Sequence, residues 1–155
     1  MKLTKLPLVA ALSLLVLSSN AWAQSTKRLI DEVNPFIGTS NFGTTNPGAV
    51  VPNGLMSITP FNVSGSPELN KFDKDKRWWS TPYTADNKFF SGFSHVNLSG
   101  VGCPELGSII VSASAGDLDV DYTHYGSAMS EEKAHPGYYS VQLDKHKIKA
   151  EVTAT

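Results

Sequence analysis

Proline and glycine interrupt this chain at short intervals, and amphipathic helical periodicity is nearly absent from it. The 155 residues include 12 glycines and 9 prolines. A helix is expected only at Thr26–Val33, which ends before Pro35, and at the short acidic stretch Ser130–Ala134. Most of the remaining apolar segments are short and lie between turn residues. This pattern predicts an all-β fold built as an antiparallel sandwich or a barrel.

Strands are expected where short apolar segments lie between these turns. They are Ala49–Val51, Leu55–Thr59, Phe89–Phe93 (interrupted by Gly92), Ser108–Ser112 and Tyr138–Leu143. In the last of these, Tyr139, Val141 and Leu143 share one face. The segment from Ile148 to Thr155 alternates apolar and polar residues, which predicts a half-buried strand. The chain stops inside this pattern, which is expected either of a strand that ends at the terminus or of a piece of a longer protein.

The first 23 residues have the three parts of a secretory signal peptide. Two lysines precede the apolar run Leu6–Leu17, and Ala21–Ala23 forms a small-x-small cleavage site. The apolar run is too short to span a bilayer stably. We therefore expect residues 1–23 to be removed and residues 24–155 to form one domain, in the periplasm or outside the cell.

Charge and cysteine content exclude several classes of function. The chain has 13 Lys and Arg against 14 Asp and Glu, and it contains no run of five like charges. Neither nucleic acid nor an anionic membrane surface is therefore an expected partner. Cys103 is the single cysteine, so no intramolecular disulfide can form. It is expected to be a small buried hydrophobe, with a catalytic thiol as the alternative.

Two segments combine polar and aromatic side chains as ligand sites do. Trp78 and Trp79 follow a charged stretch, and two indoles there favour a stacking platform for sugar rings. The alternative is that one indole packs inward and the other covers a sheet edge. The segment Gly92–Cys103 places Ser94, His95 and Asn97 among glycines, which let a backbone approach a ligand closely. A buried structural histidine is the alternative for His95.

The acidic residues do not form a recognisable catalytic or metal motif. Asp117, Asp119 and Asp121 imitate the start of a calcium loop, but Tyr122 and Ala128 stand where glycine and glutamate are needed. A strand with acidic residues on its wet face is the preferred interpretation. Glu131 and Glu132 are expected on a charged loop. We assign no catalytic residue and no metal ligand in this chain.

Several segments, in this order, resemble the N-terminal domain of glycoside hydrolase family 92. They are Val33–Thr39 (VNPFIGT), Asn46–Ala49 (NPGA), Val51–Gly54 (VPNG), Gly92–Gly102 (GFSHVNLSGVG), Glu132–Val141 (EKAHPGYYSV) and Ile148–Thr155 (IKAEVTAT). The resemblance implies an antiparallel β-sandwich of the galactose-mutarotase-like supersandwich type, truncated before an (α/α)6 catalytic barrel. Members are calcium-dependent exo-α-mannosidases that invert anomeric configuration.

The resemblance also implies a division of labour between the domains. The general acid, the general base and most calcium ligands belong to the barrel, whereas loops of the sandwich close one side of the substrate pocket. The substrate-binding residues expected here are Gly43, Thr44, Trp78, Trp79, Ser94, His95 and Asn97. The loop Ser40–Thr44 departs from the histidine-containing loop of many members, so the linkage preference is open.

These expectations define two competing functions. In the first, the chain is the sandwich part of a secreted α-mannosidase, is inactive alone, and has α-mannoside glycans and its own catalytic barrel as partners. In the second, it is a stand-alone carbohydrate-binding β-module. The two differ in whether helical repeats follow Thr155 in the gene.

Overall fold

The computed structural model describes residues 28–41, 43–53, 56–63, 65–66, 71–72, 81–97, 109–119, 121 and 124–155. The chain divides into two compact units, Met1–Asp31 and Glu32–Thr155, and every described strand belongs to the second. A short 3-10 helix, η2 (Leu29–Glu32), lies within the segment expected to be helical. The helical segments in the described part of the chain lack the length and continuous hydrophobicity of a membrane span.

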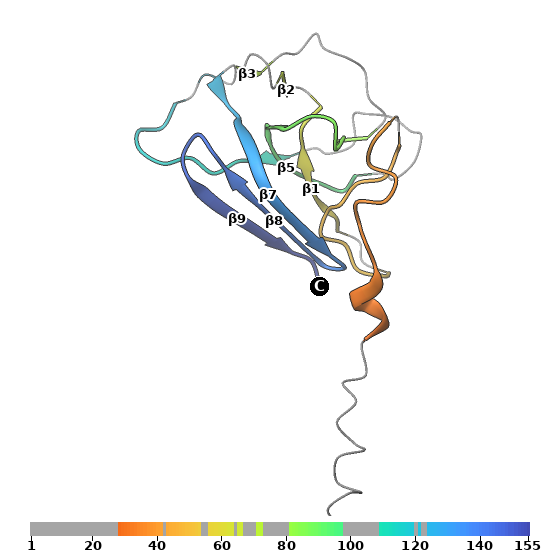
Figure 1. The fold of residues 1–155 in the computed structure, drawn as a ribbon. Coiled ribbons are helices and arrows are strands. Elements are labelled where there is room, and N and C mark those ends of the chain that lie inside the picture. The colour runs from red at the N-terminus through yellow and green to blue at the C-terminus, as the bar shows by residue number, and fades with distance from the viewer. Residues whose placement is uncertain are drawn as a thin grey trace, which may run out of the picture. The chain divides into compact units, whose positions relative to one another are not determined.

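The second unit is an all-β structure with antiparallel sheets, as the sequence predicts (Figure 1). Its strands are β1 (Ile58–Phe61), β2 (Gly65–Ser66), β3 (Lys71–Phe72), β4 (Phe89–Phe90), β5 (Gly92–His95), β6 (Ile110–Val111), β7 (Ser127–His135), β8 (Tyr138–Leu143) and β9 (Ile148–Thr153). One sheet has the order β1-β5-β6, a second has the order β4-β7-β8-β9, and β2 pairs with β3.

Aromatic rings join the two larger sheets. The Phe93 ring of β5 meets the Tyr139 ring of β8 edge-on, with centroids 6.1 Å apart, and meets the Phe90 ring of β4 at 4.8 Å. Such edge-to-face pairs add about 0.5–1.5 kcal/mol beyond the area they bury. Tyr83, Met129, Val141 and Leu143 complete the buried cluster with Phe90 and Tyr139.

The chain passes from one sheet to the other between β4 and β5. Gly92 has a φ of 155° there, and a Cβ built on it would lie 2.3 Å from Ile110 Cγ2. No side chain fits in that space, so the crossing of the chain between the sheets requires glycine at this position. The expected interruption of Phe89–Phe93 at Gly92 is therefore the point where the chain changes sheets.

Both C-terminal strands are confirmed, although β9 ends at Thr153, two residues before the expected Thr155. β8 spans the expected Tyr138–Leu143 and buries Tyr139, Val141 and Leu143. β9 keeps Ile148, Ala150 and Val152 half-buried in alternation with exposed residues, because side chains alternate between the faces of a strand.

Other expected elements were wrong. Ser130–Ala134 is part of β7 and not a helix. The segment pairs with β8, and its side chains alternate between the two faces of the sheet. β1 continues through Pro60; a proline is tolerated there because β1 is the outer strand of its sheet. The described residues 117–119 and 121 form bends and irregular backbone instead of a strand, since side-chain contacts within this segment hold a turn.

Candidate functional site

Three of the expected site residues lie at the end of β5. The Ser94 side chain is fully buried, and its Oγ donates to Asn97 Oδ1 over 3.1 Å and to the Thr59 carbonyl over 3.5 Å. His95 is half-buried. The Asn97 backbone amide donates to Ser57 Oγ over 3.2 Å. Ser94 therefore orients Asn97, and its own hydroxyl is committed inside the protein.

The Asn97 side chain has an unused donor. Its Nδ2 is buried and has no hydrogen-bond partner among the described residues, whereas its Oδ1 accepts from Ser94. A buried donor without a partner costs about 1–3 kcal/mol. The arrangement leaves an oriented, buried amide N–H group without an acceptor among the described residues.

The loop that carries Gly43 and Thr44 is joined to β1, the strand that pairs with β5. Two residues beyond Thr44, Asn46 Oδ1 accepts hydrogen bonds from Thr59 Oγ1 over 3.0 Å and from the Gly48 amide over 3.2 Å. Gly43 lies so close to the backbone of Gly38 that a Cβ would meet its carbonyl oxygen at 1.9 Å. Strand β1 thus connects the Gly43–Asn46 loop with Ser94. Trp78, Trp79 and Cys103 lie outside the described residues.

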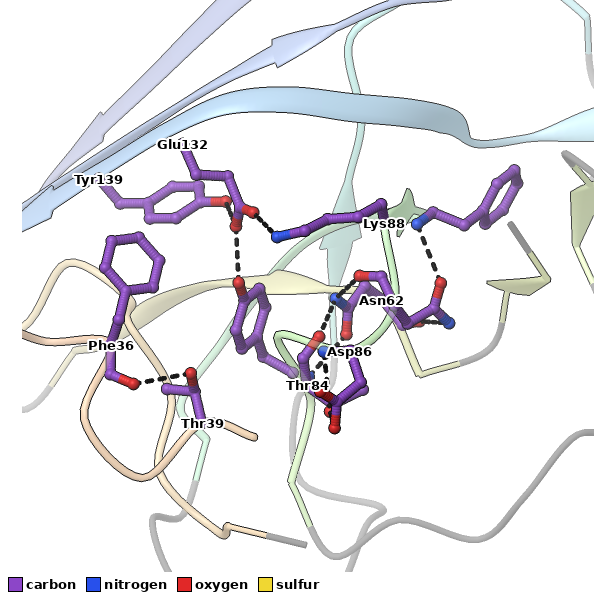
Figure 2. Close-up of polar contacts among 11 residues, drawn as sticks. Phe36, Thr39, Asn62, Thr84, Asp86, Lys88, Glu132 and Tyr139 are labelled. Atoms are coloured by element: carbon purple, nitrogen blue, oxygen red, sulfur yellow. Dashed lines mark hydrogen bonds and ion pairs between the residues drawn. The ribbon is translucent and has the colours of Figure 1, made fainter. Parts of the chain in front are cut away.

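Glu132, which the sequence predicts on a charged loop, carries a nearly buried carboxylate. Glu132 belongs to β7, and its side chain is 8% exposed. The hydroxyls of Tyr83 and Tyr139 donate to Glu132 Oε1 over 2.7 and 2.8 Å, and Lys88 Nζ donates to Oε2. Figure 2 shows the Tyr139 hydroxyl and the Lys88 side chain directed at the Glu132 carboxylate. The Tyr83 and Tyr139 pKa values are raised well above 10, first by burial and then by the Glu132 charge.

A β-bulge explains why Glu132 faces inward. Ser130 pairs with Gln142 but Lys133 pairs with Ser140, so β7 has one residue more than β8 in this interval. Glu131 has a φ of 52° at the same place. A bulge re-aims the side chains that follow it. Here Met129 faces the core before the bulge and Glu132 faces it afterwards.

Asn62 fastens the loop of residues 82–87 to the end of β1. Its side chain is fully buried, and Nδ2 donates to the carbonyls of Thr84 and Asn87 over 2.7 and 2.6 Å. Its Oδ1 accepts from the Thr84 amide over 2.8 Å. Figure 2 shows this cluster beside the Glu132 cluster. The two clusters anchor the segment that follows Trp78 and Trp79 in the sequence. Neither cluster is predictable from the sequence, because no local motif marks Asn62 or Glu132.

The acidic stretch that imitates a calcium loop is held by a histidine. His124 Nδ1 lies 2.7 Å from Asp119 Oδ2, and Asp119 Oδ1 accepts from the Asp121 amide over 2.9 Å. The Asp121 amide and then His124 lower the Asp119 pKa. Within the described residues, no three His, Cys, Asp or Glu side chains gather as a metal site.

Comparison with known proteins identifies the fold. Residues 32–155 match the glycosyl hydrolase family 92 N-terminal domain. The chain is 29% identical over 153 residues to an uncharacterized secreted glycosidase of Arthroderma benhamiae, covering 93% of this chain and 18% of that protein.

Solved structures agree. The GH92 α-mannosidase BT3965 of Bacteroides thetaiotaomicron is 32% identical, with a TM-score of 0.69 over 83% of this chain and 17% of that one. The GH92 glycosyl hydrolase ccman5 is 28% identical, with a TM-score of 0.60 over 83% of this chain and 18% of that one. The chain thus spans under a fifth of the length of these relatives. It belongs to glycoside hydrolase family 92, of which it carries the N-terminal domain.

Proposed function

We propose that this chain is the substrate-pocket-completing N-terminal domain of a secreted exo-α-mannosidase that hydrolyses α-mannosides of glycans with inversion. The observation that carries the proposal is the match of residues 32–155 to the family domain, together with the structural likeness to an α-mannosidase. Residues 1–23 act as the signal peptide, and residues 24–155 enter the periplasm or the medium. The secreted glycosidase of Arthroderma benhamiae supports that destination.

The chemistry of inversion assigns catalysis to another part of the protein. An inverting glycosidase needs two carboxyl groups about 6.5–9.5 Å apart with a water between them. Glu132 is the most deeply buried carboxylate for which the structure gives contacts, and two tyrosine hydroxyls and Lys88 occupy its oxygens. It is therefore unsuited to protonate a leaving group. The paired carboxyls and the calcium ligands are proposed to lie in an (α/α)6 barrel, and this chain alone is proposed to be inactive.

The pocket wall is proposed to combine the residues fixed around β1 with the two indoles. The Asn97 amide supplies a donor, His95 a half-buried imidazole, and the Gly43–Thr44 loop a close backbone approach. Trp78 and Trp79 supply apolar faces for a sugar ring. Such contacts raise the rate only if they strengthen in the transition state.

A comparison of two proteins tests the function. The chain as given is expected to release no mannose from α-1,2-, α-1,3- or α-1,6-mannobiose, whereas a protein that continues it into helical repeats is expected to release β-mannose. Chelation of calcium should abolish that release. Hydrolysis by the chain alone would overturn the division into domains. A sugar-binding chain whose gene encodes no further domain would support the alternative, a stand-alone carbohydrate-binding module.

A further inference from the structure

A cavity of about 750 Å³ opens at the end of the β1–β5 pair opposite to His95. Phe61, which lines it, pairs with Gly92 at one end of these strands, whereas Ile58 pairs with His95 at the other. Ile58 and Phe61 are three residue steps apart along β1, or about 10 Å. Ile110, which also lines the cavity, pairs with Ser94, but the lining includes neither His95 nor Asn97, so the cavity differs from the pocket wall proposed above. Its volume lies within the range of about 300–1,000 Å³ that is typical of small-molecule sites.

Buried residues form the depth of this cavity, and one of them has an unused polar group. Ser91, Ser127 and Leu143 line the cavity and are buried. Ser127 Oγ donates to the Ala128 carbonyl and accepts from the Lys145 amide. Ser91 is 9% exposed, and its Oγ has no partner among the described residues. A ligand hydroxyl that reached this depth could hydrogen-bond to Ser91 Oγ. That bond would offset the free-energy cost of a buried hydroxyl without a partner.

The exposed part of the lining carries apolar surface. Tyr125 and Leu118 line the cavity and are 41% and 79% exposed. An aromatic face beside aliphatic carbon is the surface on which the C–H face of a sugar ring packs. The cavity therefore has a buried hydroxyl at depth and an apolar wall nearer to solvent.

Charges of both signs surround the apolar wall. Asp117 and Asp119 line the cavity together with His124, Lys145 and His146. Contacts fix several of them: Asp119 binds His124, and Lys145 Nζ donates to the His124 carbonyl over 3.0 Å. Because donors and acceptors of opposite charge share the rim, neither an anion nor a cation is favoured. A neutral ligand with several hydroxyls can use both kinds of group.

We propose that this cavity is a second carbohydrate-binding site, which takes a neutral sugar with its apolar face on Tyr125 and a hydroxyl on Ser91. The site rests on its own geometry and does not require that the protein hydrolyse mannosides. It would hold a glycan chain at a distance from the pocket in which a terminal sugar is cleaved.

Amide chemical shifts of the ¹⁵N-labelled chain, titrated with α-1,6-mannobiose, test the proposal. The amides of Ser91, Leu118, Gly126 and Lys145 should shift together with one Kd. Shifts confined to residues 94–97 would place the sugar at the other end of β1 and overturn the proposal. The proposal would also be overturned if the sugar changed no amide chemical shift, or if an apolar probe changed the shifts of these amides and the sugar did not.

Two variants and a control make the assignment specific. Tyr125→Ala is expected to weaken binding about tenfold or more, as loss of a binding aromatic does. Ser114→Trp, at an exposed position of the lining, should block the cavity without disturbing the core. Tyr138→Ala, outside the lining, is the matched control and should bind normally. Equal binding by all three variants would overturn the proposal, whereas mannose release by the longer protein tests the proposed function independently.

Discussion

The Tyr83 hydroxyl donates to Glu132 Oε1 over 2.7 Å and joins two segments that are 49 residues apart in the sequence. Tyr83 lies in the loop that follows the tryptophan pair, and Glu132 lies in β7 of the four-stranded sheet. Both side chains are almost completely withdrawn from water. A buried carboxylate without partners is costly, so this hydrogen bond, with those from Tyr139 and Lys88, makes the position of Glu132 tolerable.

Replacement of Glu132 should therefore destabilise the fold. Glu132→Ala leaves two buried tyrosine hydroxyls without an acceptor, and we expect a loss of about 2–4 kcal/mol in the free energy of unfolding. Glu132→Gln keeps an acceptor oxygen but loses the charge that faces Lys88. Its loss in the free energy of unfolding should therefore be smaller than that of Glu132→Ala. Urea denaturation measures both. Glu131→Gln, at the exposed neighbour, is the control, and an equal effect there would show that the buried cluster contributes nothing.

The same cluster predicts the response to alkaline pH. Burial and the Glu132 charge raise the pKa of Tyr83 and Tyr139 in the folded protein above the value near 10 of the unfolded chain. The unfolded chain therefore loses these protons first as the pH rises. The contribution of the two tyrosines to the free energy of unfolding is fully present below pH 10 and falls as the pH rises above 10. Above pH 10, each tyrosine should lower the free energy of unfolding by about 1.4 kcal/mol per pH unit. Tyr83→Phe should make the fall in stability above pH 10 less steep; an unchanged slope would contradict the assignment.

Sequence patterns predict only the regular part of this fold. β8 and β9 are predicted because their period of two is unbroken from Tyr138 to Leu143 and from Ile148 to Thr153. β7 contains a bulge at Glu131, and one extra residue reverses which side chains face inward. A charged pair such as Glu131-Glu132 gives no sign of that reversal. The sequence therefore predicts Glu132 on a charged loop or in a short acidic helix, although its carboxylate is nearly buried in β7.

Long-range hydrogen bonds set a similar limit at the candidate site. Ser94 and Asn97 are three residues apart, so their contact agrees with a local motif. Asn62, in contrast, fixes Thr84 and Asn87 from 22 and 25 residues away, and no spacing rule connects them. The sequence identifies polar residues in a glycine-rich segment as site candidates. It does not show which of them, like Ser94, form hydrogen bonds inside the protein instead of facing a ligand.

Gly92 offers a test of the crossing between the two sheets. In Gly92→Ala the new Cβ would lie 2.3 Å from Ile110 Cγ2 and 3.1 Å from the Val111 carbonyl. Strand β6 must then shift away from β5, and we expect about 2–4 kcal/mol of lost stability, as steric and backbone strain add. Thermal melting measures it. Gly116→Ala is the control, because Gly116 also has a positive φ but nothing lies within 4 Å of its Cβ position.

Asn97 tests the oriented donor of the proposed pocket. Asn97→Asp keeps the acceptor for Ser94 but replaces the buried N–H group by oxygen. In a protein long enough to contain the proposed barrel, this change should lower kcat/KM for α-mannosides about tenfold or more, because a carboxylate cannot donate a hydrogen bond to the sugar oxygen that the amide N–H group would bind. Ser57→Ala, which removes only the support of the Asn97 backbone amide, should have a smaller effect. Equal kinetics for Asn97→Asp and the parent protein would leave Asn97 as a structural residue.

The tryptophan pair provides the last prediction. Within residues 24–155, Trp78 and Trp79 are the only tryptophans, so the tryptophan emission of that segment alone reports on these two indoles. If they stack on sugar, α-mannobiose should change that emission, and Trp78→Ala or Trp79→Ala should weaken mannoside turnover by the longer protein. Loss of a stacking aromatic costs about 1–3 kcal/mol, or roughly ten- to a hundredfold in rate. The melting temperature should stay near that of the parent protein, because a pocket wall is not part of the core. Unchanged turnover in both variants, or a large fall in melting temperature in either, would instead assign the indoles to packing.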